Sequence, residues 1–182
     1  PPSKKMKKDE IISLSYYQID DYLTCPLKYK YVHILRVPLL PNHQIIYGLA
    51  LHRAVQAYFM AKKNRQRFSE KELLNTFANN WSSEGFISRE HEEQRFAAGK
   101  AALKKFYKGE KKRGRDPKFV EEEFTILEDK IQVRGRWDLV EEAKSKVYMV
   151  DFKSSEVRTQ EEADKRVKES LQLAIYALAW FK

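Results

Sequence analysis

The chain has 182 residues, of which 42% are hydrophobic and 13% aromatic, enough to build the core of one globular domain. Its formal net charge of +9 favours a polyanionic partner such as nucleic acid. No apolar run reaches the roughly 18 residues of a membrane-spanning helix, so we expect a soluble protein that does not engage a membrane. The single cysteine, Cys25, excludes an internal disulfide and favours a reducing, intracellular setting.

Residues 1–10 are rich in lysine and show no apolar periodicity, so we predict a basic tail or a linker there. Residues 11–182 are predicted to form one domain. Because the chain does not begin with methionine, we expect it to be a fragment of a longer protein.

The first predicted elements are short helices. Ser15 is placed to cap a helix that breaks at Cys25-Pro26, and an aromatic, basic helical turn restarts at Leu27. A loop is predicted around residues 38–41, which begin and end with proline.

Three longer helices are predicted next. From Gly48, the apolar residues at positions 51, 54, 55, 58 and 59 share one helical face, with His52 at its edge. Ser69 and Glu72 have the spacing of a capping box for a helix to about residue 81. A further helix is predicted over residues 88–108.

The pattern changes to short β-type runs after Pro117. Residues 119–127, 131–141 and 147–153 are rich in β-branched and aromatic side chains and are separated by polar breaks, which predicts an antiparallel meander of three strands. A charged segment then leads into a compact apolar helix over residues 170–178. The fold class is therefore predicted as α/β, a sheet flanked by helices.

Strand alternation places a charged pair on one face of the last strand. Asp151 and Lys153 share that face, whereas Val150 and Phe152 point toward the core. If the hairpin loop is formed by residues 143–146, Asp138 lies directly opposite Asp151. Their Cβ atoms would then be about 4.5–5.5 Å apart.

Two carboxylates that face each other repel unless a cation or a proton lies between them. Hard oxygen ligands suit Mg²⁺ or Mn²⁺, and Lys153 would then stabilise charge on a phosphate. The alternative is that Asp138 and Asp151 are solvated and that Lys153 is only a surface ion-pair partner. Gly135 supports a site, because a glycine inside a strand often marks close approach of a ligand or of another backbone.

Several motifs in order resemble the RecB-like branch of the PD-(D/E)XK nuclease superfamily. They are His52 after Gly48, Asp138 after Gly135, Asp151-Phe152-Lys153, and Gln172 with Tyr176. The segment at residues 15–29 also resembles the opening segment of that family. The resemblance covers residues 13–176. It implies a restriction-endonuclease-like core with a mixed sheet, and four ordered motifs are far more specific than one.

The resemblance also implies roles for these residues. His52, Asp138, Asp151 and the main-chain carbonyl of Phe152 would bind the metal, and Lys153 would be the catalytic lysine. Gln172 and Tyr176 lie four residues apart, so on a helix they share a face and could reach the same phosphate or lysine. For Gln172 and Tyr176, the alternative is that they only pack in the core. For His52, the alternative is a half-buried histidine with a structural role.

The sequence departs from some relatives in two respects. Relatives with an iron-sulfur cluster place one ligand at the position of Cys25 and three more after the last helix, so we expect no cluster from within this chain. Many relatives follow a helicase domain, and no helicase motif is present here. A helicase in the same parent polypeptide remains a possible partner.

Glu121 precedes the strand that carries Asp138. A two-residue turn at Asp129-Lys130 would put Glu121 opposite Asp138, where it could assist a second metal. We favour the alternative, that Glu121 is a solvated acid at the end of a strand.

Basic residues suggest where a phosphate backbone could bind. The candidates are Lys28, Lys30, Lys104, Lys105, Lys108, Lys111, Lys112 and Arg113. A solvated helix face is an equally good interpretation of the last six.

Together these features predict a Mg²⁺- or Mn²⁺-dependent deoxyribonuclease that acts on single strands or ends in DNA repair or recombination, in the cytoplasm at the nucleoid. The alternatives are a non-catalytic nucleic-acid-binding module of a helicase and an RNA-cleaving nuclease.

Overall fold

The computed structural model describes residues 11–40 and 42–182, so the predicted basic tail lies outside the described residues. By packing, the chain falls into two compact units. The first unit comprises the chain up to Pro38, Glu123–Trp137 and Thr159–Lys182, and the second comprises Leu39–Glu122 and Asp138–Arg158. A single domain over residues 11–182 stays a prediction.

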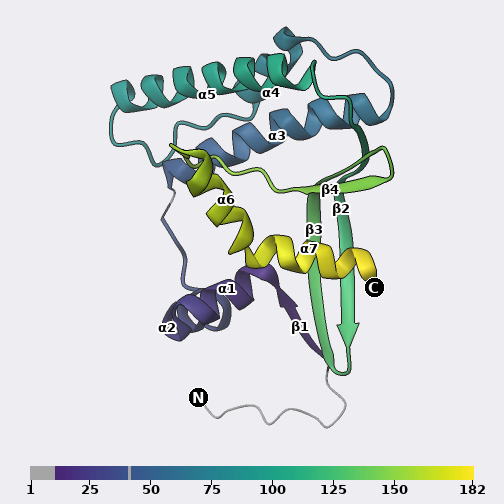
Figure 1. Cartoon of the computed structure of the whole chain (residues 1–182). Coiled ribbons are helices and arrows are strands. Elements are labelled where there is room, and N and C mark those ends of the chain that lie inside the picture. Colours follow the sequence, from purple (N-terminus) through teal and green to yellow (C-terminus); the bar gives the residue numbers. More distant parts are fainter. Residues whose placement is uncertain (1–10, 41) are drawn as a thin grey trace. The chain divides into compact units, whose positions relative to one another are not determined.

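Four strands form one mixed sheet among the described residues (Figure 1). They are β1 (Ile12–Ser15), β2 (Asp116–Glu128), β3 (Ile131–Ala143) and β4 (Lys146–Val150). The order is β1-β3-β2, and β4 also pairs with β3. β1 runs parallel to β3, with Ile12 opposite Ile131, whereas β4 runs antiparallel to it. The predicted α/β class with a mixed sheet is confirmed, and the sequence analysis missed β1.

The first unit holds the short helices. They are α1 (Tyr16–Thr24), α2 (Pro26–Tyr29), the π-helical segment η1 (Lys30–Ile34), α6 (Gln160–Lys168) and α7 (Leu171–Phe181). Ser15 caps α1 as predicted: its hydroxyl accepts from the Gln18 N–H, and the Gln18 side chain accepts from the Ser15 N–H at 2.8 Å. Pro26 begins α2, where its missing N–H costs nothing.

The second unit holds α3 (His43–Lys63), α4 (Glu70–Asn79) and α5 (Arg89–Glu110), which pack on one another (Figure 1). Phe59, Leu73 and Phe77 are fully buried between them. Val120 of β2 and Leu139 of β3 join the same apolar cluster, so this core supports the sheet segments on which the acids lie. In the part of the chain that the structure describes, no helix is both long and apolar enough to cross a membrane.

Candidate active site

The β3–β4 hairpin sets the positions of the two predicted acids. Ala143 pairs with Lys146, so the turn consists of Lys144 and Ser145. Their φ angles of 48° and 63° are those of a type I′ turn, which matches the twist of the strands that it joins. The last pair before the acids is Leu139 with Val150, so the next positions on the two strands are Asp138 and Asp151. The predicted register is confirmed up to this pair.

The predicted end of the last strand is wrong. β4 ends at Val150 rather than at Lys153, because the N–H of Phe152 donates to Oδ2 of Asp138 at 2.9 Å. The carboxylate oxygen of Asp138 thus accepts the hydrogen bond that a backbone carbonyl of the neighbouring strand would accept if the strand pairing continued. The predicted inward faces are confirmed, since both Val150 and Phe152 pack against the core cluster of the second unit.

Asp151 and Lys153 form an ion pair. Nζ of Lys153 lies 2.8 Å from Oδ2 of Asp151, whose side chain is 6% exposed, whereas that of Lys153 is 55% exposed. Burial raises the pKa of Asp151, and the nearby carboxylate of Asp138 adds to the rise, while Lys153 opposes it. The ammonium group therefore favours the ionised form of a desolvated acid and remains open to solvent itself.

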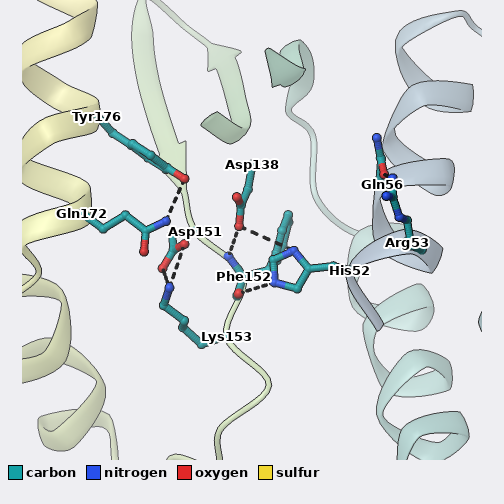
Figure 2. A network of polar contacts seen from close by, with 9 residues as sticks. All are labelled: His52, Arg53, Gln56, Asp138, Asp151, Phe152, Lys153, Gln172 and Tyr176. Atoms are coloured by element: carbon teal, nitrogen blue, oxygen red, sulfur yellow. Dashed lines mark hydrogen bonds and ion pairs between the residues drawn. The ribbon is translucent and has the colours of Figure 1, made fainter. Parts of the chain in front are cut away.

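His52 is brought to the acids by α3. One turn before it, a Cβ atom on Gly48 would lie 3.3 Å from Oγ of Ser154, so glycine lets the segment after β4 pass close to the helix. Nε2 of His52 lies 2.7 Å from the carbonyl oxygen of Phe152, and Nδ1 lies 3.9 Å from Oδ2 of Asp138 (Figure 2).

The two ring nitrogens of His52 face different groups. A carbonyl only accepts, so Nε2 of His52 carries the hydrogen, and in a neutral ring Nδ1 is then an acceptor. That acceptor faces the carboxylate of Asp138. Two acceptors that face each other are stabilised by a cation or a proton between them.

Glu121 supplies a third acceptor. A nitrogen of His52 and carboxylate oxygens of Glu121 and Asp138 all lie within 4.8 Å of one another. Glu121 has a φ of 50° in the interior of β2, although the other described non-glycine residues with positive φ follow helices or lie in turns. Such backbone strain, about 1–3 kcal/mol, is retained mainly at functional sites. The sequence analysis favoured a solvated acid here, and no alternation pattern reveals a left-handed residue within a strand.

The donor set fits a divalent metal ion. One imidazole nitrogen and two carboxylates, with the Phe152 carbonyl at hand, are ligands that suit Mn²⁺ or Mg²⁺. Asp151 is not a member of the converging group, so its predicted role as a ligand stays a prediction.

Gln172 and Tyr176 lie on α7 in the first unit. Nε2 of Gln172 donates to the Tyr176 hydroxyl at 2.9 Å (Figure 2), so the two residues share a helix face as predicted. Both are buried, and the Tyr176 ring contacts Phe124 edge to face at 5.8 Å. This packing accounts for Tyr176, and the catalytic roles of both residues stay predictions.

The predicted nucleic-acid contacts differ in their surroundings. Lys104, Lys105, Lys108 and Lys112 are exposed on or just after α5, Lys30 is exposed on η1, and the ammonium group of Lys111 lies over the Tyr107 ring. Lys28 pairs with Asp21 at 2.6 Å. Arg113 is bound to Glu110 at 2.7 Å and to the fully buried Glu141 at 3.2 Å. The contact role of all eight stays a prediction.

An acid on β3, an acid-lysine pair just after β4 and a histidine on α3 that converges with the first acid form an arrangement that suits a metal-dependent phosphodiesterase. In a comparison with protein families, the model of the PD-(D/E)XK nuclease superfamily matches residues 13–182, and the chain therefore belongs to that superfamily. A search of curated proteins found no match. Membership indicates a metal-dependent nuclease, a hydrolase that acts on phosphodiester bonds.

Proposed function

We propose that the chain is a Mg²⁺- or Mn²⁺-dependent deoxyribonuclease of the RecB-like branch that processes DNA ends in repair or recombination. The observation that carries the proposal is the convergence of His52, Glu121 and Asp138. One imidazole nitrogen and carboxylate oxygens of two residues converge there. The exposed ammonium group of Lys153 on the adjoining segment adds a cation that a phosphodiester can meet.

His52, Glu121 and Asp138 would hold the metal ion, with the Phe152 carbonyl as a further ligand. A divalent ion bound there supplies a Lewis acid that polarises a phosphodiester oxygen. Asp138 has a second task, since its bond to the Phe152 N–H positions the carbonyl of the same residue. Asp151 holds Nζ of Lys153, and Lys153 stabilises the charge that develops on the phosphate oxygens.

The preference for nucleic acid rests on charge. The net charge of +9 attracts a polyanion over a Debye length of about 10 Å. Exposed Lys104, Lys105 and Lys108 lie on α5 of the same unit as the acids, where each neutralised phosphate would add about 0.7–0.9 to the salt slope of binding. A helicase domain in the same polypeptide would supply the ends.

The test is a cleavage assay on end-labelled single-stranded DNA, double-stranded DNA and RNA, with Mg²⁺, with Mn²⁺ and with chelator. Asp151→Asn and Lys153→Ala should each abolish metal-dependent cleavage. Asp129→Asn and Lys168→Ala remove the same charges at exposed positions and should leave it intact. Equal activity in wild type and both site variants would refute the assignment, cleavage of RNA alone would change the substrate, and binding without cleavage would indicate a nucleic-acid-binding module.

A further inference from the structure

A small apolar pocket opens beside the candidate metal ligands. Leu51 and Val55 of α3, Ala102, Leu103 and Phe106 of α5, and Phe152 line a cavity of about 170 Å³. All of these residues belong to the second unit. The lining is almost entirely hydrocarbon, so the pocket favours an apolar group over water.

The size of the pocket restricts its occupant. Pockets for drug-sized ligands measure about 300–1,000 Å³, whereas an apolar cavity of about 150 Å³ takes up a single benzene ring. A volume of about 170 Å³ therefore suits one flat ring system. The rings of Phe106 and Phe152, which both line the pocket, stand edge to face at 6.4 Å, so part of the wall is an aromatic surface of the kind on which bases stack.

The polar residues at the pocket connect it to the site. His52, Lys153 and Ser154 also line it, and the first two belong to the proposed catalytic group. A phosphodiester held by Lys153 would thus have the pocket directly next to it. The group attached to that phosphate through its sugar is a nucleobase.

We infer that this pocket receives the nucleobase next to the scissile phosphate, an inference that rests on the proposed nuclease function. A base that enters the pocket leaves its stack and its pairing partner. The site therefore acts on single-stranded DNA or on a frayed end. Most of the surface that lines the pocket is hydrocarbon, so the pocket takes any base with little selectivity.

Ala102 provides a direct way to close the pocket. Its side chain is exposed, so Ala102→Leu adds bulk at the pocket without disturbing the buried core. Ala101 is also exposed and points about 100° away around the helix, so Ala101→Leu is a matched control. Leucine is a good helix former at both positions.

Binding is measured on the full chain in chelator, where no cleavage occurs, with a fluorescein-labelled oligothymidylate and with an abasic oligomer of the same length and charge. Ala102→Leu should weaken oligothymidylate binding roughly tenfold, since stacking supplies a comparable share of affinity for each base. It should leave abasic binding unchanged, and Ala101→Leu should change neither.

Equal losses for both oligomers, or no loss for either, would overturn the pocket assignment. Cleavage by the wild-type chain is measured separately in Mn²⁺. If the wild-type chain cleaves DNA while Ala102→Leu shows no base-dependent loss, the pocket inference fails and the nuclease assignment stands. If the wild-type chain does not cleave, the nuclease assignment fails.

Discussion

Asp138 and Phe152 are joined by a hydrogen bond from backbone to carboxylate of 2.9 Å, and the carbonyl of the same phenylalanine contacts His52 at 2.7 Å. One backbone residue thus connects the acid on β3 to the imidazole on α3. The geometry of the candidate ligands depends on this connection as much as on the ligands themselves, because groups that hydrogen-bond to metal ligands fix the orientation of those ligands.

Asp138→Asn should lower Mn²⁺ affinity at least roughly tenfold, measured by isothermal titration calorimetry. The amide oxygen can still accept from the Phe152 N–H, so the fold is retained and only the charge is lost. Asp129→Asn is the control, because Asp129 is exposed in a turn with a φ of 50° that asparagine tolerates. Unchanged affinity in Asp138→Asn would remove this residue from the ligand set.

Glu121→Gln should also reduce Mn²⁺ affinity roughly tenfold, because it removes one of the two carboxylates that converge with His52. Glu123→Gln removes the same charge two residues later at an exposed position and should have no effect. If the two variants titrate alike, Glu121 is not a ligand, and its positive φ has another cause.

Gly135→Ala should destabilise the protein by about 1–3 kcal/mol, measured by urea unfolding. A Cβ atom there would overlap the ring of Phe124, so the glycine is explained by packing and not by the approach of a ligand. Phe124→Leu should relieve much of that penalty in a double-mutant cycle. Strict additivity of the two changes would argue against this contact.

Asp21 should make the melting temperature of the protein depend on pH in the acid range. Its hydrogen bonds with Lys28 and His33 lower the pKa of its carboxyl group. A lowered folded-state pKa stabilises the protein above the unfolded value of about 3.9, and this contribution is lost as the pH falls through the folded-state pKa. Asp21→Asn should therefore lower Tm at pH 7 and lower it less near pH 3. For Asp20→Asn, the difference in Tm from the wild type should not shrink between pH 7 and pH 3.

Arg113→Ala should reduce the free energy of unfolding by about 2–3 kcal/mol, because it leaves the buried carboxylates of Glu110 and Glu141 with weaker compensation. Lys112→Ala, at the exposed neighbouring position, should change stability by less than about 0.5 kcal/mol. An Arg113→Ala variant that is fully stable but binds DNA poorly would contradict this structural role. It would support the predicted role of Arg113 as a nucleic-acid contact.

The predictable parts of the fold are those with strong local signals. The capping boxes at Ser15 and Ser69 and the hairpin register follow from chemistry within a few residues. β1 was missed because four residues at a sheet edge carry no periodicity, and its partner in β3 is more than a hundred positions away. α6 was described only as a charged segment because it has no buried residue, so no apolar face marked it.

The sequence predicts the site residues whose positions follow from regular strand pairing. It does not predict those whose positions depend on a local departure from regular strand geometry. Asp138, Asp151 and Lys153 follow from strand alternation, and His52 needed the family resemblance. Glu121 joins them through a local departure from strand geometry, and Arg113 is held in part by Glu141, which lies far along the chain. Neither effect is encoded in neighbouring residues.

The two-residue turn at Lys144 and Ser145 limits the insertions and deletions that the β3–β4 hairpin can accept. Inserting one codon there would slide β4 by one position and exchange its two faces, which would move Asp151 away from Asp138. Natural relatives should therefore keep the length of this turn or change it together with a compensating bulge.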